Sequence, residues 1–116
     1  MTKKIVLLIE DSQWSSANQL RKISDKEVEI IAVPIEKTAL TLGSLHVDIC
    51  VIDACKGPHR EICTASLVKI VRALFKGPVI AISYTAPSRV PLMIAGCNYE
   101  TSKGNLPKLL QTKLLS

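Results

Sequence analysis

The sequence predicts a single α/β domain over residues 1–116, built as a doubly wound, five-stranded parallel sheet with helices on both faces. Four apolar, β-branched runs indicate this class, at residues 4–10, 28–34, 47–53 and 78–84. Runs without strict alternation of apolar and polar residues suit strands that are covered on both faces. The intervening segments are long enough for crossover helices, and right-handed crossovers fold five strand-helix repeats into one parallel sheet.

The segments between the strands carry helical patterns. The clearest helix is expected over residues 60–76, with Lys69, Arg72 and Lys76 on a solvated face and Gly77 ending it. Its apolar face is predicted to comprise Cys63, Leu67, Ile70, Val71 and Leu74. Further helices are expected over residues 14–24, 35–45 and 88–95, together with an edge strand over 97–102 and a final helix capped by Asn105.

Composition narrows the class of partner. The 116 residues are 47% apolar, which is enough for one core and leaves no room for a second domain. The net charge of +5 permits an acidic partner, but the 15 basic residues are spread along the chain. Aromatic residues make up only 3%, which argues against the base-stacking surfaces of single-strand nucleic-acid binders. The sequence therefore argues against nucleic acid as the partner.

The start of the chain bears on its compartment. In "MTKKIVLLIEDS" the apolar stretch lasts five residues before Glu10 and Asp11, which is too short for a signal peptide or a membrane span. We therefore expect a cytoplasmic protein that makes no use of a membrane.

The chain has four cysteines, Cys50, Cys55, Cys63 and Cys97, and no two of them have C-x-x-C spacing. In a reducing compartment, scattered cysteines are expected to act as small buried hydrophobic residues. Cys55, His59 and Cys63 are four residues apart and would line one face of a helix as soft-metal ligands. This alternative supplies only three ligands, and Pro58 falls where such a helix would begin.

Chemistry-bearing side chains gather at the carboxyl ends of the predicted strands, where ligands bind in sheets of this kind. They are Glu10 and Asp11 after the first strand, Asp53 after the third, Ser83 near the end of the fourth and Lys103 after the fifth. Three carboxylates packed together resist ionisation unless a cation is present, and Mg²⁺ accepts carboxylates, a backbone carbonyl and waters. Lys103 and Ser83 can then bind an anion attached to Asp53.

With these residues, the chain resembles the receiver domain of a two-component response regulator. "IEDS" matches the acidic pair of that family, "VIDACKGP" the acceptor aspartate, "PVIAISYTA" the hydroxyl residue and "AGCNYETSKG" the lysine. Ser83 falls five residues after Pro78, and Lys103 falls eight after Ala95, as in the family pattern. Thr85 takes the place of Ser83 if the strand ends two residues later. The resemblance covers essentially the whole chain.

The resemblance implies that Asp53 accepts a phosphoryl group from a sensor histidine kinase, a phosphotransfer protein or a small phosphodonor. It implies that Mg²⁺ is held by Glu10, Asp11, Asp53 and the backbone carbonyl of Cys55. Ser83 and Lys103 would contact the phosphoryl group and move the fourth-strand loop, which is the output. The protein is expected to act on a downstream protein target without an effector domain of its own and, autophosphatase activity apart, without being an enzyme. A second copy of the chain is a further candidate partner.

The chain departs from the family pattern at four positions. Gly57 stands where proline is usual, Tyr84 where a small residue follows the hydroxyl, Glu100 where an aromatic switch residue is usual, and Gly104 where proline follows the lysine. These departures leave open an alternative: a pseudo-receiver that acts as a phosphorylation-independent interaction module. A small hydrolase or nucleotide binder is disfavoured, because no glycine-rich phosphate loop and no G-x-S-x-G turn is present.

Overall fold

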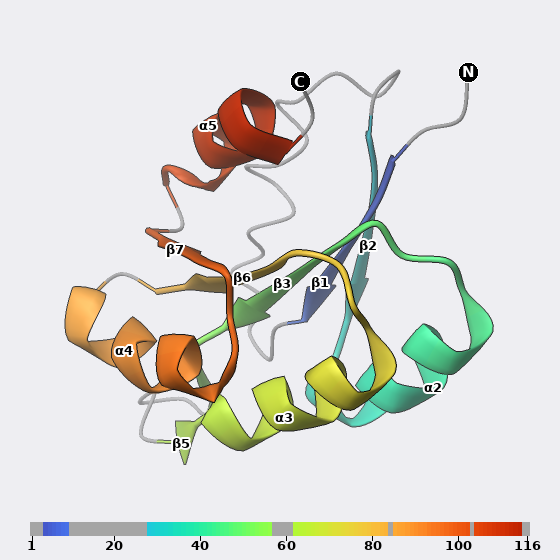
Figure 1. Cartoon of the computed structure of the whole chain (residues 1–116), viewed down its shortest axis with the longest axis horizontal. Helices are drawn as coiled ribbons and strands as arrows, with labels where there is room; N and C mark the ends of the chain where they lie inside the picture. Colours follow the sequence, from blue (N-terminus) through green and yellow to red (C-terminus); the bar gives the residue numbers. More distant parts are fainter. Residues whose placement is uncertain (1–3, 10–27, 57–61, 84, 103, 115–116) are drawn as a thin grey trace.

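The computed structural model describes residues 4–9, 28–56, 62–83, 85–102 and 104–114, and it confirms the predicted α/β class (Figure 1). Five strands form one sheet in the order β2-β1-β3-β6-β7, and every neighbouring pair is parallel. The strands are β1 (Lys4–Ile9), β2 (Val28–Val33), β3 (Ile49–Asp53), β6 (Val79–Ile82) and β7 (Tyr99–Thr101). The edge strand β7 is shorter than the predicted 97–102.

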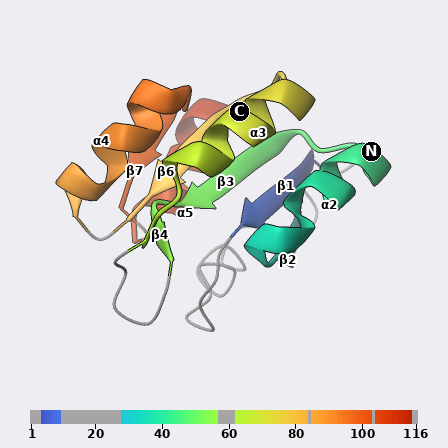
Figure 2. The same ribbon diagram turned by 90° about the horizontal axis from the view of Figure 1, so that it is seen from below.

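Helices cover both faces of this sheet. One face carries the 3₁₀ turn η1 (Ile35–Lys37), α2 (Thr38–Ser44), α3 (Ala65–Leu74) and α4 (Ala86–Ala95). In Figure 2, α2, α3 and α4 lie side by side across it. The other face carries α5 (Leu106–Leu109), which continues as the π-helical turn η2 (Leu110–Leu114). The helix predicted over residues 14–24 lies outside the described residues. No helix in the described ranges is long and apolar enough to cross a membrane.

The central strand β3 explains why its sequence is an unbroken apolar run. All five of its residues are buried. Cys50 and Ile52 belong to the core beneath α2, α3 and α4, whereas Ile49 and Val51 belong to the core beneath α5. Because successive side chains of a strand point to opposite faces, a strand covered on both sides needs apolar residues at every position.

The helix predicted over 60–76 is shorter than expected. It begins at Ala65, and part of the predicted first turn is instead a small antiparallel hairpin of β4 (Cys55–Lys56) and β5 (Ile62–Cys63). The hairpin lies between the end of β3 and the start of α3, so the chain is paired as strands near the place where the helix was expected to begin. The idea that Cys55, His59 and Cys63 line one helix face is therefore wrong, because the two cysteines belong to strands. His59 lies outside the described residues.

The buried face of α3 is also rotated from the predicted one. Leu67, Val68 and Val71 are buried, whereas Ile70 and Leu74 are each 49% exposed. The cause is the position of α3 between α2 and α4, both of which it contacts. The apolar spacing alone allowed either stripe, and the neighbouring helices decided between them.

Arg72 does not lie on a solvated face as predicted. Its Nε donates to the carbonyl of Gly96 at 2.9 Å, and its Nη1 donates to the carbonyl of Gly77 at 2.7 Å. Its Nη2 donates to Oδ1 of Asn98, and this oxygen also accepts the backbone N–H of Val79 at 2.9 Å. The guanidinium therefore ties α3 to the loops that precede β6 and β7, at the amino edge of the sheet.

Two cysteine side chains behave as the sequence predicted. Cys50 and Cys97 are buried in the core beneath α3 and α4. Desolvation by burial raises the pKa of Cys50 to about 12 and that of Cys97 to about 11. Both thiols therefore stay protonated at neutral pH, and they serve packing rather than nucleophilic chemistry.

Removing the Arg72 guanidinium should destabilise the fold. In Arg72→Met the side chain keeps its length but leaves three acceptors without their charged donor, and such hydrogen bonds contribute about 1.5–3 kcal/mol each. Two of these bonds are only part-buried and the third is exposed, so water replaces part of what is lost. We therefore expect a loss of roughly 2–4 kcal/mol in the free energy of unfolding, measured by urea denaturation. Lys69→Met, on the exposed face of the same helix, is the matched control and should change stability little. Equal effects of the two substitutions would contradict the assignment.

A carboxylate at the amino edge should make stability depend on pH. Oδ2 of Asp48 accepts the backbone N–H of Ile5 at 2.7 Å, which lowers the pKa of Asp48 below its ordinary 3.8. Its stabilising contribution is therefore present above pH 3.8 and is lost as pH falls through the folded-state pKa. Thermal melts of the wild type and Asp48→Asn should differ at neutral pH and converge towards about pH 2. A difference that is constant with pH would exclude this role.

Candidate functional site

Asp53 and Ser83 lie at the carboxyl ends of neighbouring strands. Asp53 is the last residue of β3 and is opposite Ile82 in the parallel register. Ser83 follows β6 directly. Both residues are buried: Asp53 is 5% exposed and Ser83 is 3% exposed. The N–H of Ala54 donates to the carbonyl of Ile82 at 2.8 Å, so the two strands stay paired up to the site. The structure thus brings the predicted acceptor and the predicted hydroxyl residue to one edge.

The structure places Ser83 and its rival Thr85 differently with respect to the strand end. Strand β6 ends at Ile82, so Ser83 occupies the strand end, whereas Thr85 is exposed and precedes α4. The Thr85 hydroxyl bonds with that of Ser88 at 2.7 Å, and the Thr85 N–H donates to Oγ of Ser83 at 3.2 Å. A hydroxyl that accepts one bond still has its own hydrogen to donate. Ser83 can therefore donate a hydrogen bond to an anion at the strand ends.

Thr64 supports the backbone of the acceptor strand, and sequence reasoning missed it. Its buried hydroxyl donates to the carbonyl of Asp53 at 2.6 Å, and its N–H donates to the carbonyl of Ala54 at 3.0 Å. These two bonds close the segment that leaves β3, passes through the hairpin and returns to α3. The backbone of Cys55, the predicted carbonyl ligand, lies within this closed segment. A threonine before a helix looks in sequence like an ordinary helix cap, so no signal marked it.

The remaining predicted site residues are Glu10, Asp11 and Lys103, and all three lie outside the described residues. The described strands lead towards the same edge. Ile9, the last residue of β1, is opposite Ile52 of β3. The Ser83 N–H donates to the carbonyl of Thr101, the last residue of β7, at 3.4 Å. The ends of β1, β3, β6 and β7 are thus in consecutive positions along one edge of the sheet.

The oxygen atoms in the described part of the site are suitable ligands for a hard cation. An ionised Asp53 offers only oxygen acceptors, and the backbone carbonyl of Cys55 follows two residues later. Oxygen donors of these two kinds are those that Mg²⁺ prefers. No group of three or more His, Cys, Asp or Glu able to hold a metal occurs within the described ranges, which exclude the acidic pair at residues 10–11.

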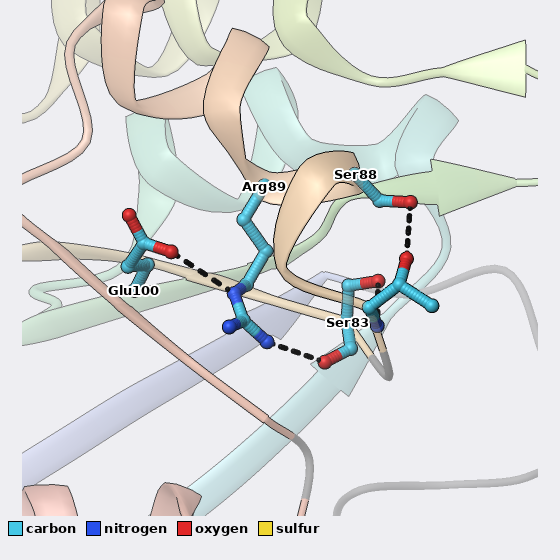
Figure 3. A network of polar contacts seen from close by, with 5 residues as sticks. Ser83, Ser88, Arg89 and Glu100 are labelled. Atoms are coloured by element: carbon cyan, nitrogen blue, oxygen red, sulfur yellow. Dashed lines mark hydrogen bonds and ion pairs between the residues drawn. The ribbon is translucent and has the colours of Figure 1, made fainter.

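Arg89 is a second residue that sequence reasoning missed, and it lies beside Ser83 (Figure 3). Its Nη1 donates to the Ser83 carbonyl at 2.8 Å, and its Nε forms an ion pair with Oε1 of Glu100 at 3.2 Å. The Arg89 side chain is only 13% exposed, and that of Glu100 is 39% exposed. Glu100 was the one signal in the sequence that pointed to Arg89. An acidic residue on an edge strand, where the family usually has an aromatic residue, indicates a basic partner nearby.

Comparisons with known proteins find matches in structure and none in sequence. No family model and no curated protein matches the sequence. A two-component response regulator from Clostridium difficile matches the structure with a TM-score of 0.76 at 16% identity, over 96% of this chain and 92% of that one. The receiver domain of a Francisella response regulator matches with a TM-score of 0.73 at 17% identity, over 94% of both chains.

A CheY-like receiver domain protein from Methanospirillum hungatei matches with a TM-score of 0.69 at 19% identity, over 95% of this chain and 89% of that one. These identities are low, so the likeness concerns the arrangement of strands and helices. The site described above lies at the carboxyl edge of that arrangement. The chain therefore has the fold of response regulator receiver domains.

Proposed function

We propose that the chain is a phosphoryl-accepting receiver of a two-component signalling system and that Asp53 is the acceptor. One observation carries the proposal. A carboxylate is kept at the end of a fully buried central strand, and a buried hydroxyl residue directly follows the neighbouring strand. Burying a carboxylate costs free energy that a partner or a bound cation must offset, so Asp53 marks a place where such a group is needed. The carboxyl edge of a parallel sheet is also where ligands bind in folds of this class.

In the proposed reaction, a carboxylate oxygen of Asp53 attacks the phosphorus of a phosphohistidine or of a small acyl phosphate. The new P–O bond forms as the bond from phosphorus to the leaving group breaks, and the leaving imidazole or carboxylate departs with its electron pair. Ser83 donates a hydrogen bond to a phosphoryl oxygen, and Lys103 pairs with its charge. Mg²⁺, held by Glu10, Asp11, Asp53 and the Cys55 carbonyl, would supply charge neutralisation.

The partners follow from this chemistry. The phosphodonor is a sensor histidine kinase or a phosphotransfer protein, and the receiver acts in the cytoplasm through a downstream protein. Its own catalysis is limited to hydrolysis of the aspartyl phosphate. A pseudo-receiver is the second candidate, and the observation that favours it is the Arg89–Glu100 ion pair, which stands where the family has an aromatic switch residue.

Phosphorylation is tested directly with acetyl phosphate and Mg²⁺. The wild-type protein should gain the mass of one phosphoryl group in intact mass spectrometry, and Asp53→Asn should gain none. Asp48→Asn is the matched control, because it removes an aspartate from the opposite edge of the sheet. Omitting Mg²⁺ or adding a chelator should abolish the gain. An unmodified wild type, or an Asp53→Asn variant that still gains the mass, would refute the assignment of Asp53 as acceptor. The pseudo-receiver would then be the remaining candidate.

Thr64 should affect the reaction by positioning the acceptor backbone. Thr64→Val keeps the shape but removes the donor to the Asp53 carbonyl, and a lost buried hydrogen bond costs about 1–3 kcal/mol. We expect lower stability and a phosphorylation rate reduced on the order of tenfold, since about 1.4 kcal/mol corresponds to a factor of ten. Thr64→Ser keeps the hydroxyl and should restore most of the rate. If both substitutions slow the reaction equally, the hydroxyl bond is not the cause.

A further inference from the structure

Arg89 connects three parts of the molecule that the proposed function does not yet link. It belongs to α4, its Nη1 contacts the Ser83 carbonyl at the site, and its Nε contacts Glu100 on β7 (Figure 3). A planar guanidinium can reach two acceptors at once in a fixed geometry, which a lysine ammonium does less well. The side chain is largely buried, so it depends on these acceptors in place of water.

Ser83 is held at every polar group. Its N–H donates to the Thr101 carbonyl at 3.4 Å, and its Oγ accepts the Thr85 N–H at 3.2 Å. Its carbonyl accepts Nη1 of Arg89 at 2.8 Å. The shortest of these bonds, and the only one made to a charged group, is the one from Arg89. Any shift of Ser83 towards a group on Asp53 must therefore lengthen or replace the bond from Arg89.

Glu100 determines where Arg89 can lie. It is in the middle of β7 and opposite Ala81 in the register, so its backbone is fixed by the sheet. Its carboxylate holds Nε of Arg89 on the side of α4 that faces β7. One side chain, that of Arg89, thus joins the Ser83 carbonyl to β7.

We propose that Arg89, held by Glu100, is the positioning residue that keeps the unphosphorylated receiver in its resting arrangement. The inference rests on the proposed function, and it specifies how that site is regulated. When a phosphoryl group on Asp53 draws the Ser83 hydroxyl towards it, the Arg89–Ser83 bond is released, and the ion pair with Glu100 at the α4–β7 surface rearranges. An ion pair thereby takes the place of an aromatic rotamer change.

Thermodynamic linkage gives the direction in which the Arg89–Ser83 bond changes the affinity for a phosphoryl group. If a phosphoryl group weakens the Arg89–Ser83 bond, then removing that bond must favour binding of the phosphoryl group by the same free energy. Arg89→Met should therefore bind a phosphoryl mimic more tightly although the protein itself becomes less stable. A residue with only a structural role would lower both quantities. The distinctive result is therefore a higher affinity for the mimic together with a lower stability of the protein.

The test uses beryllofluoride with Mg²⁺ as the phosphoryl mimic on the full chain, with binding followed by ¹⁵N NMR. We expect Arg89→Met to bind about fivefold more tightly than the wild type, within the usual range of coupling between sites, and to have a lower melting temperature. Arg89→Lys keeps the charge but not the two-acceptor geometry, and Glu100→Gln keeps an acceptor but not the charge. Both should give smaller shifts in the same direction. Lys69→Met is the control for loss of a cation and should leave affinity unchanged.

A second signal makes the test independent of the variants' stability. In the wild type, the Nε–H resonance of Arg89 should be protected from exchange with water and should shift or lose its protection when the mimic binds. The Nε–H of Arg72, which donates to Gly96 at the opposite edge of the sheet, is the internal control and should not change.

The outcomes separate this inference from the proposed function. If the mimic shifts the backbone signals of Asp53 and Ala54 but leaves the Arg89 resonance and the affinity of Arg89→Met unchanged, the function stands and the inference is overturned. If the mimic binds neither the wild type nor Arg89→Met, both are overturned. Binding gained only in Arg89→Met would support the inference, because it would show that Arg89 holds the wild type in the resting arrangement.

Discussion

Burial of β3 on both faces is the constraint on which the rest of this structure depends. The strand lies between β1 and β6, and its side chains alternate between two separate cores. Its last residue, Asp53, is carried by this rigid element to the edge of the sheet with little freedom to move. In the proposed reaction, a carboxylate positioned by a central strand needs few other groups, because phosphoryl transfer depends mainly on positioning and charge neutralisation.

The two edges of the sheet are organised by similar means for different purposes. At the amino edge, Arg72 binds three acceptors in the loops before β6 and β7. At the carboxyl edge, Arg89 binds the Ser83 carbonyl and Glu100. Arg72 joins segments on which the fold depends, whereas Arg89 joins the candidate site to an exposed surface. The same guanidinium chemistry therefore stabilises one edge and couples the other to its surroundings.

The departures from the receiver pattern gain a physical meaning from these contacts. Glu100 is not a vacant switch position, because it holds a largely buried arginine that reaches the site. A chain that carries an acid there and an arginine eleven residues earlier can respond to a charge on Asp53 through an ion pair. Coupling of this kind requires two arrangements of one connecting element, and Arg89 is the element that the inference assigns.

The sequence by itself determined the class of fold, the five strands of the parallel sheet and the placement of Asp53 and Ser83 at strand ends. These features are local: a run of apolar, β-branched residues and the polar residue that ends it are visible over a few positions. Tertiary structure alone decided the buried face of α3, the hairpin before it, and the roles of Thr64, Arg72 and Arg89. Each of these depends on contacts between separate elements, such as the bond of Arg72 with Gly96, and such a contact leaves no periodic trace in the sequence.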